Sequence, residues 1–271
     1  FKKNIENEGD KFYRYNFFYA NYLIEKNRKK EAASILESSA KKYPRNLLIN
    51  QLRENLEKNN KNKNKFSCQN PEDILAEIFY AFANALSVQK RFELSNLYIN
   101  FSKYLNSNFK SYDALLAENL LRLGKKIDSK KIFLKLFEIG SFYKWNSSKE
   151  ISLIIEDLEG SEKSLIYLTN IYKNIDKNLY RTFDYANFLR GHDKFSESIT
   201  LYSEILSEIN KDHKMYPKVL DRRGTAYERN GEWTLAEKDL LLSLEIDPNQ
   251  AYTLNYLAYT WIEQNRKTEK A

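Results

Sequence analysis

One stretch of the chain, Pro217 to Gln250, spaces its small, large and helix-ending residues as two packed helices require. It reads "PKVLDRRGTAYERNGEWTLAEKDLLLSLEIDPNQ". Small residues at Gly224 and Ala236 let two helices approach closely, and large residues fill the space around that contact. Pro248 ends the second helix, because proline lacks a backbone donor and disfavours a helical residue before it. The stretch therefore predicts a helix-turn-helix unit of 34 residues.

The unit recurs along the chain and resembles the tetratricopeptide repeat (TPR). The matching positions in this stretch are Leu220, Gly224, Tyr227, Ala236, Leu240, Ser243 and Pro248. A further copy starts in register at Thr253 to Thr260, "TLNYLAYT". Earlier copies begin near Tyr13, Ala76, Lys110, Trp145 and Leu179. The resemblance implies an all-α fold, a right-handed α-solenoid of six to seven helix pairs.

Composition agrees with long helices joined by tight turns. Seven Gly and four Pro are few for 271 residues, which disfavours a many-stranded sheet. A hydrophobic content of 42% excludes a disordered chain. The single cysteine, Cys68, excludes an internal disulfide framework, and no apolar run reaches the roughly 18 residues that cross a bilayer.

Two irregularities interrupt the repeat. A helix from about Leu47 to Lys58 begins a unit, but the Lys/Asn-rich run "EKNNKNKNK", Glu57 to Lys65, stands where its second helix belongs. The array resumes at "NPED", where Asn70 can cap a helix and proline takes the first helical position. The second irregularity is an insertion of about four residues between Ile209 and Lys218, which we place in a loop.

These interruptions predict three parts. Residues 1–57 form an N-terminal TPR unit and an extra helix, residues 58–70 form an exposed linker, and residues 71–271 form the main array. The units of the main array begin near residues 76, 110, 145, 179, 217 and 251, and the last is truncated. We expect a hinge between Glu57 and Asn70, because this run carries few apolar residues that could hold it in place.

The net charge of +7 belongs to one end of the chain. Residues 1–65 hold 16 Lys and Arg against 8 Asp and Glu, and the remainder holds 28 against 29, which leaves +8 and −1. Basic residues with interleaved aromatic residues are typical of sites that bind single-stranded nucleic acid. Nucleic-acid binding by residues 1–65 is therefore an alternative function. Residues 66–271 are near neutral, so no basic stripe could follow a strand along the array.

The C-terminal part also resembles an alphaproteobacterial TPR family of interaction scaffolds. The matching runs are "RGTAYERNGEW", Arg223 to Trp233, and "LNYLAYTWIEQ", Leu254 to Gln264. That resemblance implies a protein of the bacterial envelope or cytoplasm with no assigned chemistry, and its longer members often carry an export signal. Periplasm and cytoplasm both stay open for this chain.

Catalytic and metal-binding patterns are missing from the sequence. His192 and His213 fall in predicted turns, and neither has a second ligand at helical metal-ligand spacing. Cys68 has no nearby His or Arg that would lower its pKa. The acidic run Glu156 to Glu162 brackets Gly160 at a helix-helix turn and indicates capping charge. We therefore predict no enzyme activity, no cofactor and no metal.

Arg223 stands where the repeat usually places leucine, on the face turned toward the partner helix. A guanidinium on that face needs a hydrogen-bond acceptor, or its charged end must reach solvent. A structural ion pair with Glu228, Glu232 or Asp239 is one interpretation, and an anion-binding arginine is the other.

A short pattern marks a candidate binding surface. "FFYAN" at Phe17 to Asn21, "YAFAN" at Tyr80 to Asn84 and "FDYAN" at Phe183 to Asn187 each place an aromatic residue and an asparagine four apart, on one helix face. In TPR proteins these positions of the first helix line the concave surface. The resemblance therefore implies concave positions for Phe17, Asn21, Tyr80, Asn84, Phe183, Asn187, Asp221, Thr225, Asn255 and Tyr259.

Amide groups beside aromatic rings suit an extended peptide, since amides can pair with any peptide backbone and rings supply apolar anchors. The sequence therefore predicts a non-catalytic scaffold that binds a protein or peptide partner on its concave face. A regulatory subunit of an envelope assembly is a special case of this function.

Overall fold

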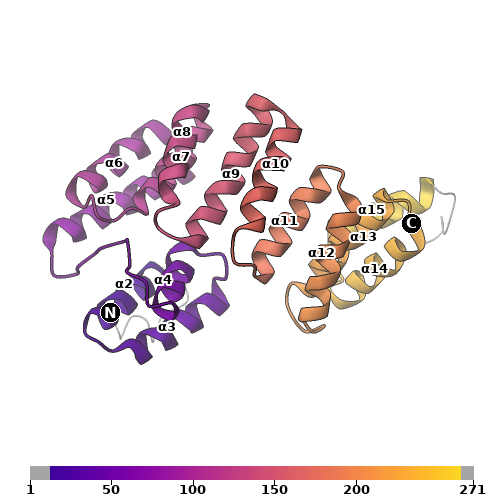
Figure 1. Cartoon of the computed structure of the whole chain (residues 1–271), viewed down its shortest axis with the longest axis horizontal. Coiled ribbons are helices and arrows are strands. Elements are labelled where there is room, and N and C mark those ends of the chain that lie inside the picture. The colour runs from indigo at the N-terminus through magenta and orange to yellow at the C-terminus, as the bar shows by residue number, and fades with distance from the viewer. Residues whose placement is uncertain (1–12, 264–271) are drawn as a thin grey trace. The chain divides into compact units, whose positions relative to one another are not determined.

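The computed structural model describes residues 13–263, which form a succession of α-helices (Figure 1). The described helices are α2 (Tyr13–Glu25), α3 (Lys29–Lys42), α4 (Leu47–Glu57), α5 (Pro71–Val88), α6 (Phe92–Leu105), α7 (Tyr112–Arg122), α8 (Lys126–Leu136), α9 (Ser141–Glu159), α10 (Ser161–Lys173), α11 (Leu179–Gly191), α12 (Phe195–Glu208), α13 (Tyr216–Arg229), α14 (Trp233–Ile246) and α15 (Ala251–Glu263). The predicted all-α fold of helix-turn-helix repeats is confirmed. The outermost residues of the predicted domains, 1–12 and 264–271, lie outside this description.

The chain divides into two compact units, residues 1–175 and 176–271. The sequence analysis predicted the boundary between two parts of the chain at residues 58–70 instead, and that segment lies inside the first unit. The expected exposure of this segment is wrong for its second half, because Asn64 and Phe66 are buried. The Phe66 ring packs on Phe18 at a centroid distance of 4.1 Å, and Asn64 forms an isolated β-bridge with Phe109.

The start of α5 shows why the array resumes where it does. Asn70 caps the helix, because its side-chain oxygen accepts a hydrogen bond from the backbone N–H of Glu72 at 3.1 Å. Pro71 takes the first helical position, where its missing N–H costs nothing. The predicted helix start at "NPED" is confirmed.

Three helix pairs of the first unit, α5/α6, α7/α8 and α9/α10, share one polar contact. Near the start of the second helix, a buried serine hydroxyl donates to a backbone carbonyl of the first helix, twelve residues earlier. The pairs are Ser95 with Ala83 at 2.7 Å, Ser129 with Ala117 at 2.7 Å and Ser164 with Ser152 at 2.8 Å. A small residue leaves its carbonyl reachable, and the bond satisfies a hydroxyl that burial would otherwise leave unpaired.

The second unit uses glycine for the same close approach. A β-carbon added at Gly224 would lie 2.9 Å from Cγ of Leu240, so this position of α13 tolerates only glycine without a shift of α14. A separate core of buried side chains joins α11, α12 and the start of α13, among them Phe183, Tyr202 and Met215.

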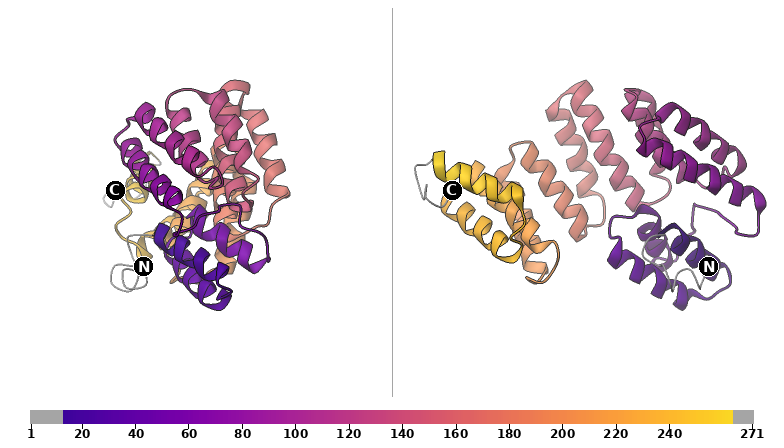
Figure 2. Two further views of the ribbon diagram at one scale, coloured as in Figure 1. Left: turned by 90° about the vertical axis from the view of Figure 1, so that its left-hand side faces the viewer. Right: turned by 180° about the vertical axis from the view of Figure 1, so that it is seen from behind.

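Helices α2–α4 do not extend the row of pairs α5/α6, α7/α8 and α9/α10. They lie beside it, with α4 packed on α9 (Figures 1 and 2). Gln51 of α4 makes this contact, because its side-chain oxygen accepts from the backbone N–H of Phe142 at 2.9 Å. Gly140, with φ +147°, lets the two helices meet, since a β-carbon there would overlap the Gln51 amide.

Glu54 completes the contact between α4 and α9. Its carboxylate accepts hydrogen bonds from Ser141 of α9, from Lys58 at 3.0 Å and from Gln51 at 3.0 Å. Burial acts to raise the pKa of this carboxyl, but the hydrogen bonds from Ser141 and Lys58 outweigh it and hold the pKa below its ordinary value. The contact is therefore strongest while Glu54 is ionised.

Replacing Gly140 by alanine should lower the free energy of unfolding by about 1–3 kcal/mol, because it combines a conformation open to glycine alone with a clash against Gln51. Urea unfolding followed by circular dichroism measures the change. Gly191→Ala is the control, since Gly191 is helical and an added β-carbon meets nothing within 4 Å. The control should be neutral or stabilise by up to about 1 kcal/mol, and an equal loss in both variants would contradict the explanation.

The lowered pKa of Glu54 makes the stability of the first unit depend on pH. The stabilisation is present above the pKa of the unfolded chain, near 4.5, and is lost as pH falls through the lower folded value. Glu54→Gln should therefore be less stable than the native chain at pH 7, and this difference should shrink steadily toward pH 3. Urea unfolding across this range measures it, and a constant difference would show that ionisation of Glu54 does not matter.

Candidate functional site

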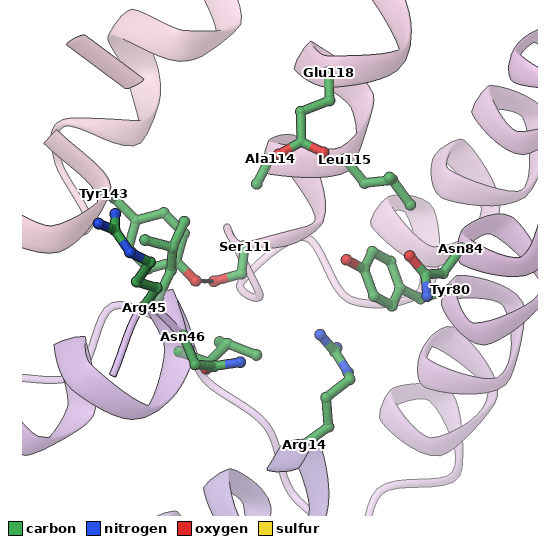
Figure 3. Close-up of a pocket in the computed structure, with 12 residues that line it drawn as sticks. Arg14, Arg45, Asn46, Tyr80, Asn84, Ser111, Ala114, Leu115, Glu118 and Tyr143 are labelled. Atoms are coloured by element: carbon green, nitrogen blue, oxygen red, sulfur yellow. Dashed lines mark hydrogen bonds between the residues drawn. The ribbon is translucent and has the colours of Figure 1, made fainter. Parts of the chain in front are cut away.

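A hollow in the first unit lies along α5, α7 and α9, and residues of α2, of α4 and of the loop before α4 line only its smaller part. It consists of two cavities, of about 210 Å³ and about 730 Å³, both lined by Asn84, Leu115 and Glu118. Figure 3 shows the smaller cavity, with Tyr80 and Asn84 on one side and Arg45 and Tyr143 on the other. The shared lining residues make the two cavities one groove.

Arg14 closes one end of the groove and joins α2 to α5. Its Nε and Nη2 donate to the two carboxylate oxygens of Glu77 at 2.5 and 2.6 Å. Its guanidinium carbon lies 4.3 Å from the centre of the Tyr80 ring, within cation-π range. Burial acts to lower the pKa of Arg14, but the Glu77 carboxylate outweighs it and raises the pKa, so the guanidinium stays charged. Arg14 therefore holds α2 against α5 and also forms part of the cavity wall.

Two hydroxyl groups fix the far wall of the smaller cavity. The hydroxyl oxygens of Ser111 and Tyr143 lie 2.5 Å apart, and both residues are buried (Figure 3). Burial raises the pKa of Tyr143, so this phenol stays protonated. This hydroxyl pair is consequently uncharged, whereas Arg45 adds a positive charge on the same side of the cavity.

The larger cavity carries charges of both signs. Lys90 and Arg122 lie on its lining together with Glu118 and Glu150. The pKa of Glu118 is raised, first by burial of the carboxyl and then by the nearby Glu150 carboxylate. The Arg122 guanidinium acts to lower this pKa but does not outweigh the other two causes. The Glu118 charge is therefore not fully stabilised by the lining, and a basic side chain of a ligand placed beside it would stabilise that charge.

Buried hydrogen bonds hold the floor under these charges. The Asn119 amide donates to Oγ of Ser95 at 2.8 Å and to Oδ1 of Asn96 at 2.9 Å, and it accepts from Ser87 at 2.6 Å. These bonds tie α7 to α5 and α6. The groove floor is thus built from fully paired polar groups, which favours a preformed site.

Two of the residues expected on the concave surface lie in this groove. Tyr80 is half-buried and Asn84 is exposed, and both line the smaller cavity. They come from successive turns of α5, as their spacing of four predicts. Ala114 and Glu118 occupy the same positions one repeat later, on α7, and line the same cavity (Figure 3).

Phe17 and Asn21 are not on an open surface, which corrects the expectation for α2. Phe17 is 1% exposed, and its ring packs on Phe109. The Asn21 amide donates to the backbone carbonyl of Phe66, and its oxygen accepts from Asn62 at 2.8 Å. The segment after α4 covers this face of α2, because its apolar Phe66 is buried there.

The expected concave residues of α11 are also occupied within the fold. Phe183 is buried against Tyr202, and the Asn187 oxygen accepts from the Tyr202 hydroxyl at 3.0 Å. The Asn187 amide donates to the carbonyl of Phe183 at 2.7 Å. These side chains hold α11 to α12 and offer little surface to a ligand.

In α13 the expected residues are bonded within the fold, Asp221 to α15 and Thr225 within α13 itself. Asp221 accepts from the Thr253 hydroxyl at 2.8 Å, and Thr225 donates to the Asp221 carbonyl at 2.6 Å. Both are buried, whereas Asn255 and Tyr259 of α15 are exposed. Burial by a neighbouring helix therefore removes Asp221 and Thr225 from any open surface.

Arg223 forms a structural ion pair. Its Nε and Nη2 donate to the Asp239 carboxylate at 2.6 and 2.9 Å, and Nη1 donates to Ser203 at 3.0 Å. Asp239 is thus the partner among the three carboxylates that the sequence offered. All three nitrogens of the guanidinium have acceptors, so the structure favours the ion pair over a site for an external anion.

Sequence reasoning missed several residues of the groove. Glu118 lies 34 residues after Asn84, so the repeat length alone identifies its position. No such signal identifies Arg14, Arg45 and Tyr143, because these residues line one cavity only through the packing of α2–α4 beside the row of pairs.

Among residues 13–263 no cluster of three potential metal ligands occurs. No described helix is both long and apolar enough to cross a membrane.

No protein-family model matches the chain, and no curated protein matches it. Solved structures do match. The C-terminal part of a TPR repeat-containing protein from Cytophaga hutchinsonii is 12% identical, with 94% of this chain and 91% of that chain covered and a TM-score of 0.52. A thermophilic TPR protein of Thermus thermophilus is 11% identical, with 69% and 99% covered and a TM-score of 0.51. Both are similar in fold, so the fold is of the TPR type.

The ion pair of Arg14 and Glu77 can be measured by a double-mutant cycle. Arg14→Met should destabilise the chain by about 2–5 kcal/mol, because it leaves the Glu77 carboxylate without its partner. Glu77→Leu should destabilise it for the same reason, and the double variant should lose less than the sum of the two. Free energies of unfolding in urea give the coupling. Additive losses would mean that the two groups do not stabilise each other.

Proposed function

We propose that this chain is a non-catalytic interaction scaffold that binds an extended peptide segment of a partner protein in the groove of its first unit. The observation that supports this proposal is the continuity of the groove, whose two cavities share Asn84, Leu115 and Glu118. The volumes of the cavities are of the size that buries a few side chains of a ligand.

The lining supplies the chemistry that a peptide needs. The Asn84 amide is exposed and can donate to and accept from a peptide backbone. Tyr80 and Leu115 offer apolar surface beside it. The paired acids Glu118 and Glu150 favour a lysine or arginine of the ligand. We therefore propose a segment with one basic side chain next to an apolar one.

Other parts of the expected function remain proposals. Asn255 and Tyr259 on α15 form a separate exposed surface that a partner could contact. Membership in an alphaproteobacterial TPR family and a regulatory role in an envelope assembly agree with a scaffold. The alternative of nucleic-acid binding gains no support, since carboxylates pair with several basic residues of the N-terminal end, namely Arg14, Arg28, Lys41, Arg53 and Lys58.

Selection of peptides from a displayed library of random 12-residue sequences tests the groove. Selected peptides should be enriched in basic residues and should bind Asn84→Ala and Glu118→Gln about 3- to 10-fold more weakly than the native chain. This factor corresponds to the loss of one hydrogen bond, about 0.5–1.5 kcal/mol. Binding is measured by fluorescence anisotropy on labelled peptides.

Asn170→Ala and Glu162→Gln are matched controls, because both residues are exposed on α10 and neither lines a groove cavity. They should bind like the native chain. Groove variants that bind the peptides as tightly as the native chain, or controls that lose as much affinity as the groove variants, would refute the proposed site.

A labelled 20-nucleotide RNA at about 50 mM salt tests the alternative function of nucleic-acid binding. RNA binding that weakens steeply as the salt concentration rises would favour that alternative.

A further inference from the structure

The α5/α6 pair exposes a row of large apolar side chains on the side turned away from the groove. We call these six residues the end face: Ile74, Ile78, Phe82, Leu94, Leu97 and Phe101. Each is between 40% and 57% exposed. The three residues of α5 are four apart and those of α6 are three and four apart, so each helix contributes one continuous stripe.

Aromatic rings join the two stripes into one surface. The Phe79 ring lies 5.9 Å from Tyr98 and 5.6 Å from Phe101, and the Phe82 ring lies 6.0 Å from Tyr98. Phe79 and Tyr98 are half-buried and form the floor between the exposed side chains. The end face is therefore an ordered, packed surface, whereas isolated exposed side chains would need no explanation.

The end face is the open end of a stacking interface that the unit already uses. Pair α7/α8 packs on α5/α6, and pair α9/α10 packs on α7/α8. A preceding pair would cover the other side of α5/α6. Helices α2–α4 precede it in sequence, but they pack beside the row, with α4 against α9. The apolar stripes suited to a neighbouring pair are consequently left exposed.

Charge and area both fit a second copy of the chain. Between residues 74 and 88 the one charged side chain is Glu77, which pairs with Arg14 on the groove side, and residues 94–102 carry no charge. Two copies can therefore meet without repulsion between like charges. About half of the surface of six large side chains is on the order of 500 Å². That is more than half of the ~800 Å² that one partner of a standard interface buries.

We propose that the end face is a dimerisation surface, on which the end face of a second copy packs about a two-fold axis. The stripes of both copies then pack on each other, and a two-fold contact closes without leaving a free end face. The groove lies on the opposite side of α5, with Tyr80 and Asn84, so dimerisation leaves it open. This inference does not depend on peptide binding.

Sedimentation velocity of the whole chain between about 1 and 100 µM tests the dimer. The native chain should change with concentration from a monomer of 32.2 kDa toward twice that mass. Ile78→Glu and Phe82→Glu each place a charge on the end face and should raise the dimer dissociation constant at least about 100-fold. Both residues are exposed, so circular dichroism and thermal unfolding should show an unchanged fold.

Ile127→Glu is the matched control, because Ile127 is 64% exposed on α8, outside the end face. This variant should dimerise like the native chain. A native chain that stays monomeric at 100 µM overturns the proposal. So does a dimer that survives both Ile78→Glu and Phe82→Glu, because it would use another surface, and so does equal disruption by Ile127→Glu.

Discussion

The helix pairs of this protein depend on close contacts at small residues. In pairs α5/α6, α7/α8 and α9/α10, an alanine or serine of the first helix lets the second helix come near enough for its serine to donate to the carbonyl at that position. At Gly224 of the second unit the approach is closer still, because even one added carbon would meet Leu240. Larger side chains can then pack only around this contact, so they point to the neighbouring pairs and form the core.

The position of α2–α4 decides what the first unit can do. Held by Gln51 on Phe142 and by Arg14 on Glu77, these helices close the smaller cavity of the groove. The same placement leaves the other side of α5 uncovered. The packing of α2–α4 beside the row therefore leaves two different surfaces on opposite sides of α5, a groove with polar and charged groups and an apolar end face.

Equivalent positions of the repeat have different surroundings for this reason. The aromatic residue and asparagine four apart line the groove in α5, as Tyr80 and Asn84, but are buried or bonded within the fold in α2 and α11. The repeat pattern specifies which helix face these residues occupy. It does not specify whether other side chains cover that face. Phe66 comes from a segment outside the repeat, and Tyr202 is a tyrosine at the repeat position that Leu240 occupies in the next unit.

The sequence by itself determined the fold class, the start of α5 at Asn70 and the small residues at which helices pair, since these follow from local capping and steric rules. It also offered Asp239 as a partner of Arg223. Only the tertiary structure decided that the Lys/Asn-rich segment belongs to a compact unit, that Arg14 and Tyr143 line the groove and that Phe17 does not. These outcomes depend on contacts between segments far apart in sequence, such as Gln51 with Phe142, which no local spacing encodes.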